Sequence, residues 1–384
     1  MSAGAARPQV LRGRPARAWR RVAAGLAVAG LAAVLLAPVL ALWLPDTMAQ
    51  HAYDEFSFAF IARRVLPATG TPEQLIQAAN DYAKRHLWLV DNPVPYDGKP
   101  FDYLVEGIGW CDYAAKVFSR LLATRGMHVR YAFLKDAQGS SPHTLAEVYV
   151  RGKWRIVDPF FNLIYETESG EWPSLEEVTP DFVGRLLQIV RLRATTSDAV
   201  PNIIDVAQRT YPLPQPPQRS DDFLQDKNLL DWIADAYARL LGRGFACWYQ
   251  DQYLRRLAAI QDPQQRLWRR ARHYHLYGRL EEAERAYHAL WEQRPVARYA
   301  ERLPLFLGRL LIRERRFAEA QTVLEEEVTQ HPANRWAQYH LALCYEGAGD
   351  RAKAIEHFQR YQALHGAKFA LEAAAHLNRL RQPL

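Results

Sequence analysis

Cysteine is scarce in this chain of 384 residues, which contains only Cys111, Cys247 and Cys344. An odd number leaves at least one thiol free, and three cysteines are too few for a fold held together by disulfides. The length allows two or three domains, each with its own core. We therefore expect a protein folded around hydrophobic cores, with a free thiol available for chemistry.

Acidic residues are missing from the N-terminus: none precedes Asp46, whereas six arginines lie before residue 22. The net charge of the chain is +7, so the part from Asp46 onward carries only +1 (seven minus six). This balance gives no indication of a nucleic-acid partner.

A long uncharged stretch follows these arginines. The sequence VAAGLAVAGLAAVLLAPVLALWL, residues 22–44, contains 23 residues and no charge. As a helix it would reach about 34 Å, enough to cross a hydrocarbon core of about 30 Å. We expect a transmembrane signal-anchor helix in the inner (plasma) membrane, with the basic segment 1–21 in the cytoplasm and the bulk of the chain in the periplasm. A cleaved signal peptide is the alternative, since small residues occur near Ala41 and Ala49, although signal peptides usually have shorter apolar regions.

Residues 46–200 mix helical and strand patterns. The segment TPEQLIQAANDYAKRHLWL opens with the Thr-x-x-Gln spacing of a capping box, at Thr71 and Gln74, and continues as an amphipathic helix. A second helical pattern begins at Cys111, and short alternating segments rich in Val, Tyr and Phe follow it. The segment SLEEVTPDFVGRLLQIVR then returns to a helical period. This order predicts an α+β domain.

Strand patterns are scarce beyond the proline-rich segment YPLPQPPQ. We expect residues 201–222 to form an extended linker. Residues 223–263 predict two further helices.

A repeat fills the C-terminal part of the chain. The segments GRLEEAERAYHALWEQRP, RRFAEAQTVLEEEVTQHP and GDRAKAIEHFQRYQALHG align on Ala283, Ala320 and Ala354, which are 37 and 34 residues apart. A larger side chain follows each alanine by four residues, at Tyr287, Leu324 and Phe358.

This pattern resembles the tetratricopeptide repeat (TPR), in which small residues lie where paired helices cross. Gly308 and Tyr345 occupy the Gly and Tyr positions of the first helix in that family, whereas the first unit has Arg270 and Ala271 in place of Leu-Gly. The resemblance implies an all-α solenoid over 264–382, with repeats at about 264–297, 301–334 and 335–368 and a capping helix. An unrelated helical bundle is the alternative.

Cys111 lies at the start of its predicted helix. One apolar face of that helix carries positions 111, 114, 115, 118, 121 and 122. Gly126 suits the residue that ends the helix. Free backbone N–H groups and the helix dipole favour negative charge at the first turn, a setting that lowers the pKa of a thiol. Because the neighbouring Asp112 opposes this effect, a thiolate here needs a base.

Two predicted strands can supply that base. The segments SPHTLAEVYV and KWRIVDP read as a hairpin that turns at Arg151-Gly152. In this register His143 and Asp158 are two positions away from a direct pair, so they share a face as diagonal neighbours about 7–8 Å apart. A carboxylate beside an imidazole fixes its tautomer and stabilises the imidazolium.

The stretch from Gly107 to Asn162 resembles the transglutaminase-like superfamily, which is related in fold to papain-type thiol proteases. The segments GIGWCDYAA, LLATRGMHVRYAFL, SPHTLAEVY and GKWRIVDPFFN carry this resemblance. It implies that Cys111 is the nucleophile, His143 the general base and acid, and Asp158 the orienting carboxylate.

The resemblance also implies a donor that stabilises the oxyanion. The backbone N–H of Cys111 can serve as one donor, and Tyr96 or Trp88 is a candidate for another. Attack by the thiolate would give an acyl thioester. Water as acceptor makes the protein a cysteine protease or amidase, which the resemblance slightly favours, and an amine acceptor makes it a transferase. An inactive scaffold of an envelope assembly that keeps the same fold is the opposing hypothesis.

No cofactor or metal site is expected. The histidines at 273, 275, 331, 340 and 357 lack metal-ligand spacing, and we expect HYH at 273–275 to be solvated. Cys247 and Cys344 are interpreted as packing residues. The basic runs RLWRRAR and RLLIRERR are interpreted as solvated faces, with an acidic partner as the alternative. Stacked helix pairs predict a surface that recruits a protein substrate or partner.

Overall fold

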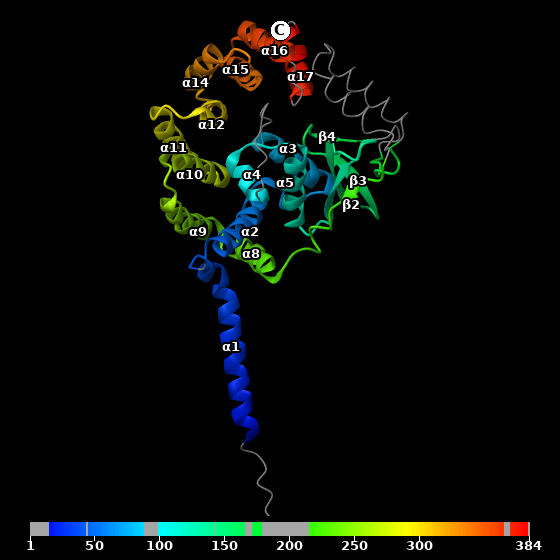
Figure 1. The fold of residues 1–384 in the computed structure, drawn as a ribbon, viewed down its shortest axis with the longest axis vertical. Helices are drawn as coiled ribbons and strands as arrows, with labels where there is room; N and C mark the ends of the chain where they lie inside the picture. Colours follow the sequence, from blue (N-terminus) through cyan, green and yellow to red (C-terminus); the bar gives the residue numbers. More distant parts are fainter. Residues whose placement is uncertain are drawn as a thin grey trace, which may run out of the picture.

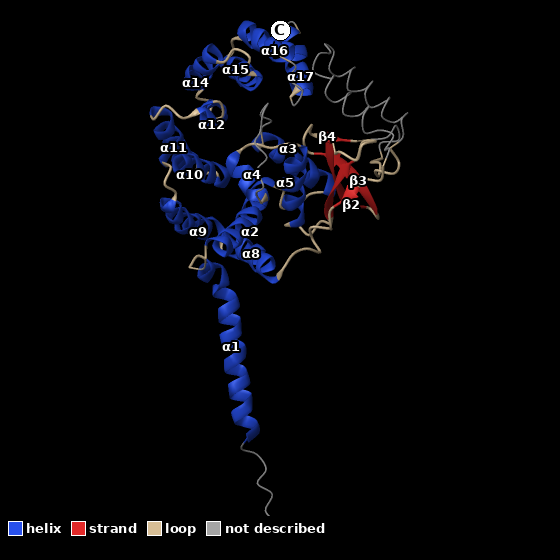
Figure 2. Cartoon of the chain, viewed as in Figure 1, coloured by secondary structure: helices blue, strands red, loops and turns tan. Residues whose placement is uncertain are grey.

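The structure is a computed structural model, and it describes residues 15–43, 45–87, 99–141, 143–165, 171–178, 215–364 and 369–382. Figure 1 shows a helix that extends away from the rest, an α+β part, and an arc of helices that curves around this part toward the C-terminus. The strands gather on one side of the molecule (Figure 2).

The extended helix is α1 (Pro15–Ala41). Several of its large apolar side chains are exposed, among them Leu26, Val28 and Leu31. In the part of the chain that is described, however, no helix combines the length and apolarity needed to cross a membrane. The transmembrane span expected over 22–44 is therefore not found.

Between α1 and the sheet, the described residues form α2 (Asp46–Val65), α3 (Pro72–His86), α4 (Pro100–Glu106) and α5 (Cys111–Ala123). The capping box predicted at Thr71 and Gln74 is confirmed, because each side chain accepts a hydrogen bond from the other residue's backbone N–H. The sequence did not predict α2. Its buried side chains occur around its whole circumference, for example Phe56, Ser57 and Phe58, so it lacks the one-sided pattern that identifies a surface helix.

The sheet contains β1 (Val129–Leu134), β2 (His143–Val150), β3 (Lys153–Asp158), β4 (Leu163–Ile164) and β5 (Gln218–Arg219). The strands are antiparallel in the order β4-β3-β2-β1-β5, and α5 packs against β1 and β2. The hairpin turns at Arg151 and Gly152, both with positive φ, as two-residue hairpin turns require. Val150 pairs with Lys153, which confirms the predicted register.

Two features around the sheet differ from what the sequence predicted. Most of the range expected as a linker, 201–214 of 201–222, lies outside the described residues, but Gln218 and Arg219 form β5, which pairs with β1. The guanidinium of Arg219 also donates to the fully buried carboxylate of Glu147 at 2.7 and 3.2 Å, which holds this short strand in place. Residues 174–178 form a turn instead of the start of the helix expected over 174–191, and the rest of that helix lies outside the described residues.

Helices follow β5 in the described part of the chain. The first two are α8 (Leu229–Leu240) and α9 (Gly242–Arg256), in the range where two helices were predicted. A short 3-10 turn, Leu257–Ala259, separates them from the later helices. The later helices are α10 (Pro263–Tyr277), α11 (Leu280–Glu292), α12 (Ala297–Ala300), α13 (Leu303–Arg313), α14 (Phe317–Gln330), α15 (Arg335–Ala348), α16 (Arg351–Ala363) and α17 (Ala370–Arg381).

Three antiparallel helix pairs, α10/α11, α13/α14 and α15/α16, follow the three repeat units. The aligned residues Ala283, Ala320 and Ala354 are fully buried. A Cβ atom on Gly308 would lie 2.8 Å from Cγ of Leu324, so the first helix of that unit approaches the second too closely for a side chain. The small residues of the repeat therefore lie at helix contacts, as predicted.

The expectation that the HYH segment, residues 273–275, is solvated was wrong. His273 and His275 are only 1% and 8% exposed, because α10 packs against α2 and α4 as well as against α11. His273 contacts the Tyr53 hydroxyl, and His275 contacts the Tyr287 hydroxyl. The repeat region therefore shares an extensive interface with the α+β part.

Candidate active site

Cys111 is the first residue of α5 and is partly buried. The N-cap of this helix is Trp110, whose side chain forms no capping hydrogen bond and is 48% exposed. The first N–H groups of a helix have no partner within the helix. The thiol thus lies at a positive helix end, beside an exposed aromatic side chain.

His143 and Asp158 form a buried pair. His143 begins β2 and is 5% exposed, and Asp158 ends β3 and is 1% exposed. The imidazole Nε2 lies 2.7 Å from Oδ2 of Asp158. The predicted diagonal relation in the hairpin therefore brings the two side chains into hydrogen-bond contact.

A network of hydrogen bonds orients Asp158. Its Oδ1 accepts hydrogen bonds from the backbone N–H groups of Phe160 and Phe161, each at 3.0 Å. The Tyr165 hydroxyl donates to Oδ2 at 3.5 Å. The turn after β3 therefore binds one carboxylate oxygen and directs the other at His143. The sequence showed the Asp-Pro turn but not these backbone donors.

The pKa of His143 is perturbed strongly. Burial by itself would lower this pKa, but the charge and hydrogen bond of Asp158, with a further contribution from a hydrogen bond to Cys111, raise it to about 10. The Cys111 thiol is therefore close enough to the imidazole to influence its pKa. Because Nε2 faces Asp158, the other ring nitrogen, Nδ1, remains for the thiol. The three residues predicted as a site thus converge.

Comparison with family models agrees with this geometry. Residues 59–159 match the model of the transglutaminase-like superfamily, and this range includes all three residues. The α+β part is a transglutaminase-like domain. Its observed form is a five-stranded antiparallel sheet with helices, followed by an all-helical TPR-like region.

Other comparisons concern the C-terminal helices. Residues 298–384 match the model of the bacterial transcriptional activator domain. Two solved structures are similar at 20% identity over 38% of this chain, each with a TM-score of 0.28. They are MamA 41-end from Desulfovibrio magneticus RS-1, covered to 92%, and the MamA RS-1 ArsTM double mutant, covered to 88%. No curated protein matches the sequence.

The TPR-like region supports the loop before the nucleophile. Helix α4 of the transglutaminase-like domain ends at Gly107, four residues before Cys111. Arg272 of α10 donates to the carbonyls of Leu104 at 2.5 Å and Val105 at 3.3 Å. These arginine contacts satisfy carbonyls and add positive charge at the C-terminal end of α4, where it is favourable.

A second arginine of the TPR-like region continues this contact. Arg302, at the start of α13, donates to the Glu106 carbonyl at 2.6 Å. The Glu106 side chain is buried and pairs with Arg298 at 3.0 Å. A Cβ atom on Gly107 would lie 2.5 Å from the Phe306 ring, so Gly107 permits this close approach. The repeats thereby fix the position of the loop from which α5 begins.

Two candidates for the oxyanion donor, Trp88 and Tyr96, lie outside the described residues. The remaining candidate is the backbone N–H of Cys111, at the start of α5. Of the other cysteines, Cys344 is fully buried, and its thiol donates to the Phe317 carbonyl at 3.0 Å. Cys247 is a partly buried free thiol.

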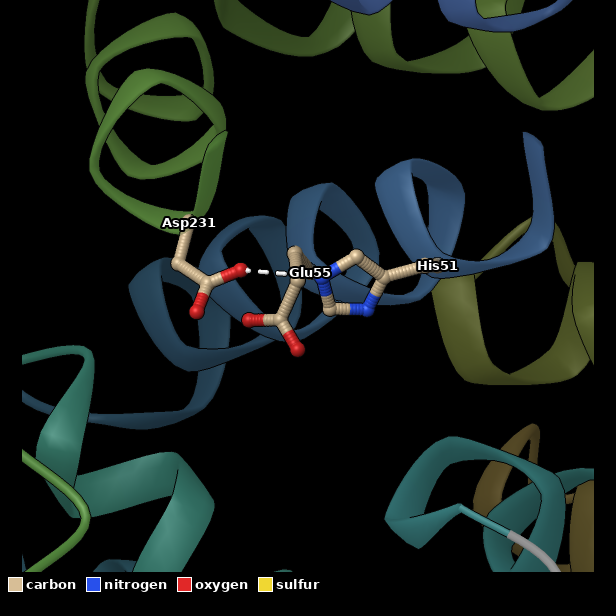
Figure 3. Close-up of side chains that lie close together, drawn as sticks. All are labelled: His51, Glu55 and Asp231. Carbon is tan, nitrogen blue, oxygen red and sulfur yellow. Dashed lines mark ion pairs between the residues drawn. The ribbon is translucent and has the colours of Figure 1, made fainter. Parts of the chain in front are cut away.

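A cluster that the sequence did not predict joins α2 and α8. His51 and Glu55 of α2 meet Asp231 of α8, with one possible ligand atom from each within 4.8 Å of the others (Figure 3). The i, i+4 spacing of His51 and Glu55 was the one sequence signal that could have indicated this cluster. Arg120 of α5, however, forms ion pairs with both Glu55 and Asp231. The two carboxylates therefore neutralise a buried guanidinium, and we interpret the cluster as an ion-pair network that holds α5 against α2 and α8.

Proposed function

We propose that the protein is a thiol enzyme that acts on amide or peptide bonds through Cys111, His143 and Asp158. The observation that supports this most strongly is the buried imidazole, which is paired with a carboxylate and lies close enough to the Cys111 thiol for the thiol to influence its pKa. A transglutaminase-like domain is compatible with a thiol amidase.

The proposed reaction uses Cys111, His143 and Asp158 in turn. His143 takes the thiol proton, and Asp158 stabilises the resulting imidazolium. The thiolate attacks the acyl carbon, the C–N bond breaks, and the leaving amine takes the proton from His143. The acyl group is then held on Cys111 as a thioester. Water resolves it to a carboxylic acid and restores the thiol, and we favour this outcome over transfer to an amine.

The helix start suits the developing negative charge. The carbonyl oxygen of the substrate becomes an oxyanion close to the backbone N–H of Cys111, where free N–H groups and the helix dipole favour negative charge. The exposed ring of Trp110 next to the nucleophile gives the substrate an apolar surface.

Paired helices form surfaces suited to protein segments, and the TPR-like region suggests protein binding. We propose that it recruits a protein substrate or partner to the transglutaminase-like domain. The buried contacts of Arg272 and Arg302 with α4 support a fixed arrangement of the two parts.

We also propose that α1 attaches the chain to the membrane, with the later residues on the extracytoplasmic side. The exposed apolar side chains of α1 support attachment. Carbonate extraction of membranes and protease digestion of spheroplasts would test this proposal. Release by carbonate, or full protection from protease in spheroplasts, would contradict it.

Trapping of the acyl-enzyme tests the enzymatic proposal. The full chain is incubated with a peptide digest of casein, quenched in acid, and analysed by mass spectrometry for acyl adducts on Cys111. Incorporation of 18O from labelled water reports hydrolysis, and labelling by a dansylated amine reports transfer. We expect adducts and 18O incorporation that are absent from Cys111→Ala and retained in Cys247→Ala, the matched control.

The opposing hypothesis is an inactive scaffold. It predicts no adduct on Cys111, no 18O incorporation and no amine transfer, with wild type and Cys111→Ala indistinguishable.

A further inference from the structure

A second group of charged and polar side chains lies between the transglutaminase-like domain and the TPR-like region, away from Cys111. A cavity of about 400 Å³ is bounded by α2 and α3 of the transglutaminase-like domain and by α10, α13 and α15 of the TPR-like region. This volume lies within the range of small-molecule sites. The walls therefore come from five helices that are far apart in the sequence.

The lining of this cavity carries charge of one sign. It includes four arginines and three histidines, and none of the described side chains that line it is acidic. The arginines are Arg64, Arg85, Arg309 and Arg313. Arg64, Arg85 and Arg313 are exposed, so the mouth is positively charged, whereas Arg309 lies deeper.

Buried polar groups line the interior. Tyr82 is 6% exposed, and its hydroxyl has no hydrogen-bond partner among the described residues. The same holds for Nδ1 of His86, a nitrogen with almost no contact with solvent. An unpartnered buried polar atom carries a free-energy cost that a ligand can remove. Apolar side chains, among them Ile61, Leu276 and Leu343, form the rest of the wall.

The histidines also experience the positive charge of nearby arginines. Burial, and then the charges of Arg309 and Arg272, lower the pKa of His86. Burial and the same two arginines lower the pKa of His275. Burial followed by the charges of Arg85 and Arg272 lowers the pKa of Arg309 itself. Cations that disfavour one another in this way favour an anion between them.

We propose that this cavity binds a small organic anion with two or more negative charges. Guanidinium groups bind phosphate and carboxylate oxygens with paired hydrogen bonds, so either kind of anion shares the required chemistry. The apolar wall suits the organic part of the ligand, and the volume suits a small molecule. The run RLLIRERR was expected to form a solvated face, but its Arg309 and Arg313 line the cavity.

Titration calorimetry on the full chain at low salt tests this proposal. The probes are inorganic pyrophosphate, adenosine diphosphate and citrate, which separate phosphate from carboxylate recognition. We expect at least one probe to bind saturably at one site, with a Kd below about 1 mM. The double variant Arg64→Gln/Arg313→Gln should weaken this binding by about tenfold per arginine lost. Both side chains are at the exposed mouth, so the fold should be retained.

A matched control keeps the same net charge. Arg63→Gln/Arg270→Gln removes exposed arginines from α2 and α10 that do not line the cavity, and it should bind like wild type. The proposal is overturned if no probe binds, or if the two double variants lose affinity equally, since that would reflect general charge attraction.

Discussion

Replacing Asp158 by asparagine tests the central pair without disturbing its surroundings. The amide oxygen can still accept the backbone N–H groups of Phe160 and Phe161 that now bind Oδ1. The amide NH₂ would then face Nε2 of His143, which must become an acceptor. The ring proton moves to Nδ1, and the imidazole can no longer take the thiol proton. Activity should fall by about 10²- to 10⁴-fold.

The same change has a consequence for stability. The pKa of His143 is raised from 6.5 to about 10 in the folded protein. Its contribution to the free energy of unfolding is therefore fully present below pH 6.5 and is lost as the pH rises through 10. At about 1.4 kcal/mol per pH unit, the loss over this interval is at most about 5 kcal/mol. Without the carboxylate, burial should lower the pKa of His143 below 6.5 and abolish this loss.

Urea unfolding followed by circular dichroism measures this difference. Asp158→Asn is compared with the parent protein at pH 6.5, 8 and 9.5, both with Cys111 in place and kept reduced by a phosphine. Other groups titrate in both proteins, so the difference between them isolates the pair. We expect the parent to be more stable at pH 6.5 by several kcal/mol, with the gap narrowing toward pH 9.5. A gap independent of pH would refute the reasoning.

Three further predictions concern the support of the site. Arg120→Met removes the cation between two buried carboxylates and should lower the free energy of unfolding by about 3–5 kcal/mol, measured by urea denaturation. Gly107→Ala places a Cβ against Phe306 at a positive φ and should lower the free energy of unfolding by about 1–3 kcal/mol. It should also slow acylation of Cys111, measured in a single turnover, and unchanged kinetics would contradict the proposed support of this loop. Glu147→Gln weakens the ion pair that holds β5 and should speed hydrogen exchange at the Ser220 amide, which donates to the Tyr131 carbonyl of β1, while equal exchange would count against it.

The sequence predicted the features whose signals are local. The hairpin register followed from the two turn residues Arg151 and Gly152, and it was enough to place His143 beside Asp158. The helix that starts at Cys111 followed from its apolar face. The repeats followed from small residues at fixed spacing, because a helix crossing such as that of Gly308 with Leu324 leaves no room for a side chain.

The features it did not predict depend on partners distant in the chain. Helix α2 is buried around its circumference and shows no one-sided pattern. Strand β5 has only two residues, and its pairing with β1 spans more than 80 positions. His273 and His275 are buried because α10 lies between two layers, which no local pattern reveals. The cationic cavity likewise exists only after five helices have assembled.

The pairing of Cys111 with His143 is tested most directly by alkylation kinetics. The full chain is treated with limiting iodoacetamide at pH 6.5, and the labelling of Cys111 and Cys247 is followed by mass spectrometry in wild type and His143→Ala. Both thiols are partly buried, so Cys247 serves as an internal reference. The account predicts labelling of Cys111 at least about tenfold faster than Cys247 in wild type, with the excess lost in His143→Ala. Equal rates for the two cysteines, or an excess that survives without His143, would contradict it.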